Sequence, residues 1–386
     1  MISVSEALSI IYSRRPVLDA ETLPLRGISG RINAELITAR LTQPPFDSSA
    51  MDGYAVKVTD VARPGATLTI IGEAPAGSPF GGVIDAGQAV RIFTGSHVPE
   101  GADHVIIQEH VTRSGAQITV NTPSANARNI RKAGQDFILG DTLIPAGTRL
   151  DWRHVALIAA ANIAEIDVIK RPHVAILSNG NELKSPGCEI AAGEIVNSNP
   201  YALAALIESW GGAATILPVA KDSVKSITKR IAQARKADII LPVGGASVGD
   251  HDHMKPAFAA AGLDLKFSKI AVKPGKPTWF GELGTQRVLG LPGNPASALV
   301  CAHLFLKPLM GLDTGDVTTA AVSRNIPANG PRETYARGRV DFGTITLFPK
   351  QDSALISPFP KANALIKLPP NSGPWRAGDS LDYIAL

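Results

Sequence analysis

Apolar residues near the N-terminus recur at helical spacing. Ser3 and Glu6 form the capping-box pattern that typically begins a helix. Ala7, Leu8 and Ile11 then lie on one stripe of that helix. The chain is therefore predicted to open with an amphipathic helix.

From about Pro44 to Pro145 the pattern changes to short alternating runs separated by Gly and Pro. The clearest runs are Thr67 to Ile71, Ala89 to Phe93, His104 to Gln108 and Gln117 to Val120. Alternation of apolar and polar residues predicts strands with one buried face. We expect this segment to form a compact β-rich insert.

Leu150 to Ile169 returns to an Ala-rich pattern with helical periodicity. We expect this segment to pack with the N-terminal helix. The β-rich segment would then be an insert within a discontinuous helical domain.

After Arg171 and Pro172, apolar runs alternate with helical segments. The runs are Val174 to Leu177, Thr215 to Val219, Ile239 to Val243, Phe267 to Val272 and Val288 to Leu291, and the helices are Pro200 to Trp210, Ser223 to Arg235 and Ala296 to Met310. Strands that alternate with helices predict parallel βαβ units, so this region should be a doubly wound α/β sheet with helices on both faces.

Past Gly311, strand-like runs such as Thr344 to Phe348 and Ala364 to Leu368 are punctuated by Pro and Gly. They predict a small C-terminal β-barrel domain. The fold class is thus a multi-domain α/β plus β chain, and its 386 residues exceed what one core usually holds. The four expected parts are a helical linker domain (1–42 with 141–171), a β-rich insert domain (43–140), the α/β domain (172–311) and the C-terminal β domain (312–386).

Composition excludes several classes of protein. Hydrophobic residues make up 45% and charged residues 19%, which predicts a fully folded chain. The net charge of +4 is too even to indicate a nucleic-acid partner. No window reaches the roughly 18 uninterrupted apolar residues of a membrane span. We therefore expect neither nucleic acid nor membrane as a partner.

Cys188 and Cys301 are far apart and form no CxxC pair. This usage fits a reducing compartment and disfavours a disulfide framework or a zinc site. The N-terminus also lacks the basic and apolar regions of a signal peptide. A cytoplasmic location is therefore expected.

Three loops follow strands of the predicted parallel sheet, where ligands of such sheets usually bind. The first is Ser178 to Glu182, in which a glycine permits a tight turn and Glu182 offers a carboxylate. Ordinary turn chemistry gives the same residue types. This loop alone therefore leaves both readings open.

The second loop, Gly244 to Asp252, follows the strand that ends at Val243. Gly244, Gly245 and Gly249 allow the backbone to approach a ligand with its N–H groups directed at an anion, and Ser247 adds a donor. Asp250 and Asp252 beside an anion indicate a bridging cation, for which Mg²⁺ is the simplest choice. The alternative is a glycine turn whose aspartates cap the next helix.

The third loop is Lys273 to Pro277, which is followed after a strand by Gly290 to Ser297. Its two lysines, Lys273 and Lys276, are stiffened by prolines and suit a phosphate or another tetrahedral oxyanion. Asn294 and Ser297 add donors at the start of the next helix. Lysines on an exposed loop with no ligand remain the alternative.

Two segments of the β-rich insert also stand out. Asp52 lies in the run from Pro44 to Val56, and Thr94 lies in Arg91 to Ser96. Asp52 before a glycine is by itself typical of a turn. The cluster of Arg131, Lys132 and Asp136 is by itself typical of a solvated surface.

Together these segments closely resemble the MoeA family of molybdopterin molybdenumtransferases, which includes the E domain of gephyrin. The resemblance spans essentially the whole chain and rests on five ordered blocks. These are PPFDSSAMDGYAV at 44–56, RIFTG with VPEGADHVIIQE at 91–109, GGASVGDHD at 244–252, KPGKP at 273–277 and GLPGNPAS at 290–297.

The resemblance implies a molybdopterin-binding α/β domain and a homodimer whose active site is shared with the β-rich insert of the partner subunit. It implies insertion of molybdenum from molybdate into adenylylated molybdopterin, with hydrolysis of the phosphoanhydride, release of AMP and a requirement for Mg²⁺. Tungstate has the same charge and nearly the same size, so it remains an alternative substrate. Transient contacts with a molybdopterin adenylyltransferase and with molybdoenzyme acceptors are expected.

The family's functional residues fall on matching positions. The resemblance implies catalytic roles for Asp52, Thr94, Glu182, Asp252, Lys273 and Lys276. It implies substrate binding by Gly244, Gly245, Ser247, Gly249, Asp222, Pro292, Asn294, Pro295 and Ser297, and more weakly by Arg131 and Asp136. The expected Mg²⁺ ligands are Glu182, Asp250 and Asp252.

The chain departs from the family pattern at two positions, since Asn181 stands where Asp is frequent and Ala246 where Val is common. The first change removes a negative charge beside Glu182. Two other functions stay open. One is adenylylation of molybdopterin, which would not need the insert and the C-terminal domain; the other is a binding scaffold without turnover, which would not need the acidic and basic residues.

Overall fold

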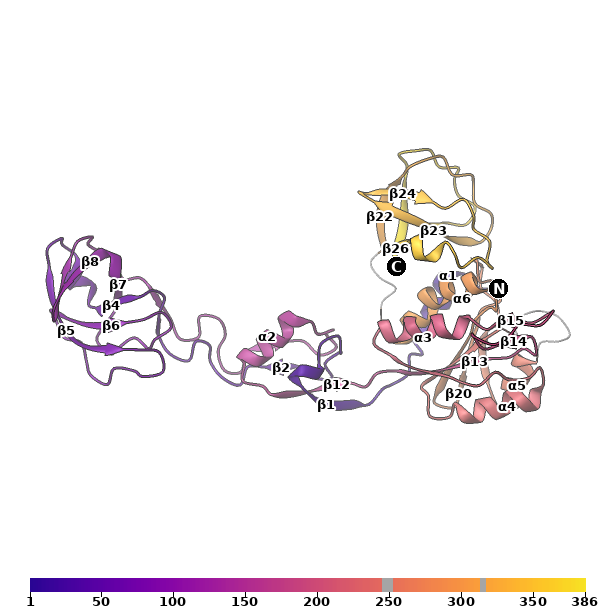
Figure 1. Ribbon diagram of the computed structural model, residues 1–386, viewed down its shortest axis with the longest axis horizontal. Helices are drawn as coiled ribbons and strands as arrows, with labels where there is room; N and C mark the ends of the chain where they lie inside the picture. Colours follow the sequence, from indigo (N-terminus) through magenta and orange to yellow (C-terminus); the bar gives the residue numbers. More distant parts are fainter. Residues whose placement is uncertain (245–252, 313–316) are drawn as a thin grey trace. The chain divides into compact units, whose positions relative to one another are not determined.

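The computed structural model describes residues 1–244, 253–312 and 317–386. The chain divides into two compact units, one formed by Met1–Asp19 with Lys170–Leu386 and the other by Ala20–Ile169 (Figure 1). Asp250, Asp252, Gly245, Ser247 and Gly249 from the predicted site lie outside the described residues.

A six-stranded sheet forms the centre of the larger unit. Its order is β16 (Ala213–Ile216), β13 (His173–Ser178), β17 (Ile239–Val243), β21 (Gln286–Gly290), β20 (Trp279–Leu283) and β18 (Asp264–Phe267). The first four strands are parallel, as the sequence predicts. β20 and β18 are antiparallel, so this edge of the sheet lies outside the predicted parallel βαβ units.

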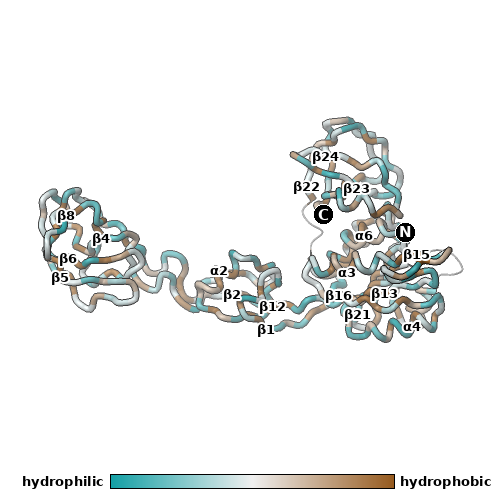
Figure 2. Tube along the Cα trace, viewed as in Figure 1, coloured by the Kyte–Doolittle hydropathy of each residue, from teal (hydrophilic) through white to brown (hydrophobic). Residues whose placement is uncertain are grey.

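Alternate residues of β13 face different helical layers. Val174 and Ile176 pack into a core with helices α1 (Val4–Tyr12), α3 (Asn199–Ser209), α6 (Pro295–Cys301) and α7 (Lys307–Leu309). Ala175 and Leu177 pack instead with α4 (Val224–Gln233) and α5 (Met254–Ala260). This period of two produces the expected sandwich of a sheet between two helical layers. Figure 2 shows the hydrophobic (brown) stretches of this unit running along strands such as β13.

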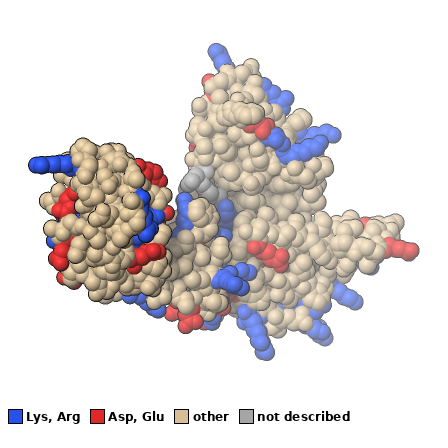
Figure 3. Space-filling view, turned by 60° about the vertical axis from the view of Figure 1, so that its left-hand side comes forward, with Lys and Arg blue, Asp and Glu red and all other residues tan. Residues whose placement is uncertain are grey.

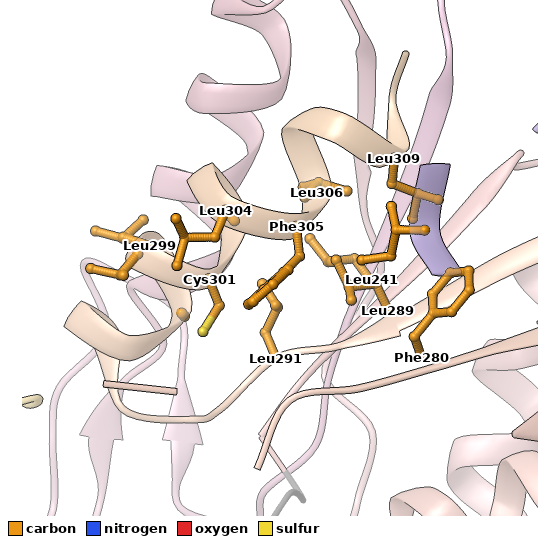
Figure 4. Packing of buried hydrophobic residues seen from close by; sticks show 14 of the residues in the cluster. Leu241, Phe280, Leu289, Leu291, Leu299, Cys301, Leu304, Phe305, Leu306 and Leu309 are labelled. Carbon is orange, nitrogen blue, oxygen red and sulfur yellow. The ribbon is translucent and has the colours of Figure 1, made fainter. Parts of the chain in front are cut away.

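The helical stretch after the third loop covers the sheet with apolar side chains. Phe305 points from it toward Leu291 on the sheet (Figure 4), and Leu299 and Leu309 belong to the same buried cluster as Leu289. The sequence predicts one helix from Ala296 to Met310. In the structure a π-helical segment, Ala302–Leu306, lies between α6 and α7. This packing fixes the start of α6 relative to the ends of the strands.

The N-terminal helix does not pack with Leu150 to Ile169, so that expected pairing is wrong. Its buried face, Val4, Ala7 and Ile11, lies in the core of the α/β domain. Leu150 to Ile169 is also not all helical. α2 spans Trp152–Ala160, and β12 (Glu165–Ile169) pairs with β1 (Ala20–Pro24), because polar and apolar residues alternate there.

The C-terminal strands close into a five-stranded barrel. They are β22 (Val317–Val322), β23 (Glu333–Asp341), β24 (Thr344–Leu347), β25 (Ala364–Leu368) and β26 (Ser380–Ala385). The pairing of β23 with both β24 and β25 closes the ring. β19 (Val272–Lys273) adds to β23, so the predicted strand from Phe267 to Val272 is divided between two sheets.

The smaller unit contains a second six-stranded sheet with the order β7 (His104–Ile107), β4 (Gly53–Val56), β6 (Gln88–Ile92), β5 (Thr67–Ala74), β9 (Gln117–Val120) and β8 (Val111–Ser114). β5, β6, β7 and β9 match the four runs predicted for the β-rich insert, and β4 and β8 are additional strands. Short pairs join β2 (Ile37–Thr38) to β11 (Thr142–Ile144) and β3 (Ser48–Ser49) to β10 (Ile130–Arg131). Among the helices of the described residues, none has the length and apolar character needed to cross a membrane.

Candidate active site

The first loop, the first residue of the second loop (Gly244) and the Gly290 to Ser297 part of the third lie at one edge of the α/β sheet. β13 and β17 are parallel neighbours that end at Ser178 and Val243, and Val243 forms a parallel bridge with Leu291. The backbone N–H of Gly244 donates to the Leu291 carbonyl over 3.1 Å. A Cβ on Gly293 would lie 3.4 Å from Gly244 Cα. The start of the glycine loop therefore lies between the other two loops.

Asp222 holds the first loop in place. Asn179 donates its side-chain amide to Asp222 Oδ1 over 2.7 Å, and the backbone N–H of Asn181 donates to Asp222 Oδ2 over 3.0 Å. Both carboxylate oxygens are thus engaged with the loop. Asn181 Oδ1 in turn lies 3.4 Å from the Asp222 backbone N–H.

Glu182 lies at the tip of the same loop and is exposed. A Cβ on Gly180, whose φ is +150°, would lie 2.6 Å from Glu182 Oε1, so this glycine leaves room for the carboxylate. Within the described ranges no hydrogen bond or ion pair uses that carboxylate. The described residues contain no group of three His, Cys, Asp or Glu that could hold a metal ion. The other two expected ligands, Asp250 and Asp252, lie outside these ranges.

The lysine loop is packed against helix α6. Gly275 has a φ of +119°, and a Cβ there would lie 2.1 Å from Cys301 Sγ. Thr278 Oγ1 donates to the Gly275 carbonyl over 2.8 Å. The side chains of Lys273 and Lys276 are exposed, and neither forms an ion pair with any described residue. The loop therefore presents two uncompensated positive charges from a fixed backbone.

Asn294 and Ser297 lie at the start of α6, after Pro292. Asn294 Nδ2 donates to Ser353 Oγ over 2.9 Å, and the Ala296 N–H donates to the Ser353 carbonyl over 2.9 Å. Ser297 is buried, and Pro295 occupies the first turn of the helix. The C-terminal barrel thus reaches back to this segment through Ser353.

A cavity of about 1010 Å³ joins these elements within the larger unit. Lys273, Lys276, Asn294 and Ser297 line one side of it. The C-terminal barrel lines the other side with Arg324, Arg332, Gln351, Asp352 and Ser353, among others. Four cations against one carboxylate give the lining a net positive charge, which favours an anionic ligand.

The sequence reasoning missed the barrel side of the cavity. Arg324 belongs to no Gly- or Pro-rich motif, Arg332 follows a Pro- and Gly-rich turn (327–331) that reads as an ordinary loop, and Gln351 to Ser353 reads as an ordinary polar loop. The available signal is charge, since residues 317–386 contain eight Lys and Arg against five Asp and Glu. Basic side chains (blue) project from this barrel, the upper lobe of the face shown in Figure 3.

Asp52 and Thr94 lie together in the smaller unit. Both the backbone N–H and the hydroxyl of Thr94 donate to Asp52 Oδ1 over 2.8 Å. These bonds, the backbone one first, lower the pKa of the Asp52 carboxyl. Gly53 is not a turn residue but the first residue of β4, where a Cβ would lie 2.0 Å from the Ile106 carbonyl oxygen. The pair presents an ionised carboxylate at the end of two neighbouring strands.

Arg91 supports this pair from the adjacent strand. Its guanidinium donates to the Gly53 carbonyl over 3.0 Å and lies 4.9 Å from the centre of the Phe93 ring. Arg131 and Asp136 line a separate concavity of about 650 Å³ in the same unit, together with Pro44, Phe46 and Gly95. Gly95 follows Thr94, so this concavity borders the Asp52 pair.

Comparison with known proteins identifies the family along nearly the whole chain. Residues 2–162 match the MoeA N-terminal region (domains I and II), residues 175–312 match a probable molybdopterin binding domain, and residues 319–386 match the MoeA C-terminal region (domain IV).

Whole proteins give the same result. The chain is 33% identical to the molybdopterin molybdenumtransferase of Haemophilus influenzae, over 99% of this chain and 98% of that protein. It is 34% identical to the protein of the same name from Nostoc sp., over 88% and 82% of the two chains. The crystal structure of a molybdopterin biosynthesis MoeA protein from Pyrococcus horikoshii covers 100% of both chains at 28% identity, with a TM-score of 0.87.

The match of three consecutive MoeA regions, two relatives above 30% identity and a solved structure of the same architecture show that this chain belongs to the MoeA family.

Proposed function

We propose that this chain is a molybdopterin molybdenumtransferase that inserts molybdenum from molybdate into adenylylated molybdopterin and releases AMP. The observation that carries the proposal is the cavity that Lys273 and Lys276 line together with Asn294 and Ser297. The lysines supply charge for a tetrahedral oxyanion, and the serine and asparagine supply donors. This cavity borders the region that matches a molybdopterin-binding domain.

The proposed chemistry has two balanced parts. Water adds to the phosphoanhydride, which separates AMP from the phosphate of molybdopterin. The two dithiolene thiols lose their protons, two Mo–S bonds form, and one oxide of molybdate leaves as water, so molybdenum keeps its oxidation state. The lysines offset the charge on both the oxyanion and the leaving phosphate.

Mg²⁺ is part of this proposal. The carboxylate of Glu182 is exposed and has no partner among the described residues, which suits a hard cation that prefers oxygen ligands. Asp250 and Asp252 would complete the set. When bound, the ion supplies Lewis acidity at the phosphoanhydride. Asp222 supports Glu182 indirectly, because it fixes the loop that carries it.

We further propose that the enzyme acts as a cytoplasmic homodimer whose active site is shared between subunits. Asp52 with Thr94 and the lysine cavity belong to different compact units of the chain, which supports a site completed by a second copy. We also expect transient contacts with a molybdopterin adenylyltransferase, which would supply the substrate, and with acceptor molybdoenzymes, which would take up the product.

The shared site is tested by mixing two inactive variants. Asp52→Ala and Lys273→Met should each abolish activity. Heterodimers formed by mixed refolding should recover it, since one of their two sites contains both intact residues. The absence of recovery in verified heterodimers would show that each site is built from a single subunit.

The reaction itself is tested with purified protein, adenylylated molybdopterin, molybdate and Mg²⁺. The proposal expects AMP release together with active cofactor, with no use of ATP. Consumption of ATP with molybdopterin would indicate adenylylation instead. Ligand binding without AMP release under any metal condition would indicate a scaffold.

A further inference from the structure

Arg337 is a buried arginine behind the wall of the anion cavity. It lies in β23 and is 2% exposed. Its guanidinium donates to the carbonyls of Leu355 over 2.6 Å and Asp352 over 2.9 Å. No carboxylate of the described residues forms an ion pair with it. Its hydrogen bonds are therefore directed at one loop, at backbone carbonyls and, from Nε over 3.4 Å, at Gln351 Oε1.

That loop is wound around Arg337. Gln351 Oε1 accepts the Arg337 backbone N–H over 2.9 Å, and Gln351 Nε2 donates to the Arg337 and Phe348 carbonyls over 2.8 Å each. The ring of Phe359 lies 5.5 Å from the guanidinium carbon. A buried charge needs such partners, so the loop and the arginine constrain each other.

The same loop forms one wall of the cavity and touches the site directly. Gln351, Asp352 and Ser353 line the cavity opposite Lys273 and Lys276. Ser353 accepts hydrogen bonds from Asn294 and from the Ala296 N–H. A continuous chain of bonds thus runs from Arg337, through Asp352 and Ser353, to the first turn of α6.

We infer that Arg337 is a positioning residue for oxyanion binding. It fixes the Gln351–Ser353 wall, and through Ser353 it holds Asn294 and the start of α6 at the distance from the lysines that a tetrahedral oxyanion requires. The inference deepens the proposed function and rests on it for the identity of the oxyanion as molybdate. A planar guanidinium has several N–H donors and can bond several carbonyls at once, which the single ammonium group of a lysine cannot do in the same geometry.

The test is titration of molybdate into the full-length protein by calorimetry, without turnover. Arg337→Lys should raise the Kd for molybdate about tenfold, and Ser353→Ala about threefold, as expected for lost hydrogen bonds at a binding site. The double variant should bind no more weakly than Arg337→Lys alone, because both act through one path. Arg339→Lys is the matched control, since Arg339 lies in the same strand but pairs with Asp341 at the surface, and its Kd should not change.

Melting temperatures measured in parallel separate positioning from folding. An unchanged Kd in folded Arg337→Lys, even with a lowered Tm, would overturn the inference. If Arg337→Lys does not fold, an unchanged Kd in Ser353→Ala would overturn it. If the wild type releases AMP but the Kd for molybdate is unchanged in both variants, the inference about Arg337 is refuted and the proposed function stands. If the Kd changes as expected but the wild type releases no AMP, the proposed function is refuted and the positioning role stands.

Discussion

Thr94 donates two hydrogen bonds, from its backbone N–H and from its hydroxyl, to the same oxygen of Asp52. The second oxygen, Oδ2, forms no hydrogen bond with the described residues and stays available to a ligand. The arrangement keeps the carboxylate ionised and oriented just before the first residue of β4. It turns two residues 42 positions apart in the chain into one functional group.

Thr94→Val should raise the pKa of Asp52 toward its ordinary value, because it removes the hydroxyl donor and keeps the backbone one. The pKa of Asp52 is lower in the folded protein than in the unfolded chain. The ionised carboxylate therefore stabilises the fold at pH values above the pKa of the unfolded chain, which is near 3.9. That stabilisation is lost as the pH falls through the folded-state pKa. Carboxyl NMR titration of Asp52 measures the change. In Thr94→Ser, Asp52 should titrate as in the wild type. Identical Asp52 titration curves in Thr94→Val and the wild type would show that the Thr94 hydroxyl does not lower this pKa.

Asp222→Ala should loosen the loop that carries Glu182. Loss of two hydrogen bonds to a carboxylate is expected to lower the free energy of unfolding by about 1–3 kcal/mol. Hydrogen exchange at the Asn181 amide should become faster. Asp264→Ala, which removes a surface ion pair with Lys266, is the control and should leave that amide unaffected. Unchanged exchange at Asn181 in the Asp222 variant would rule out the bracing role.

Gly275→Ala should displace the lysine loop, because its Cβ meets Cys301 Sγ and its φ is positive. The backbone strain alone is worth about 1–2 kcal/mol, and the contact adds to it. Gly284 also has a positive φ but has open space around it, so Gly284→Ala measures the backbone strain without a steric contact. Adding Cys301→Ala to Gly275→Ala should recover the steric part only. Equal Tm values for the Gly275 and Gly284 variants would show that the contact with Cys301 is unimportant.

The two thiols should differ in reactivity. Burial raises the pKa of the Cys301 thiol to about 12, so it stays protonated and enclosed at neutral pH. Cys188 is exposed. One thiol per chain should react with iodoacetamide in the native protein and two in denaturant, and Cys188→Ser should abolish the native reaction. Labelling of Cys301 in the folded protein would contradict the packing of the lysine loop.

Local patterns predicted the parallel part of the α/β sheet and most strands of the β-rich insert, because burial imposes its period on each strand. They failed where pairing is long-range. The antiparallel β18 and β20 and the division of Phe267 to Val272 between two sheets depend on distant partners. The docking of the N-terminal helix depends on Val4, Ala7 and Ile11 finding the α/β core, which periodicity does not encode.

The candidate site shows the same contrast. Glycine, proline and lysine in the loops at 178–182, 244 and 273–277 revealed the sheet edge, because these residues restrict the backbone or carry isolated charge. Asp222 and Ser353 stand in no such motif, and Arg332 follows a Pro- and Gly-rich turn outside the α/β domain. These residues reach the loops and the cavity only through the fold. Asp222 was found by family resemblance, and Arg332 and Ser353 only by the geometry of the cavity.

The central claim is that this chain inserts molybdenum as AMP is released, and the most direct measurement is the ratio of the two products. Purified protein with adenylylated molybdopterin, Mg²⁺ and labelled molybdate should release one AMP for each molybdenum bound to the dithiolene, and Lys273→Met should reduce both together. Molybdenum incorporation without AMP, or AMP release that leaves molybdate unused, would contradict the account.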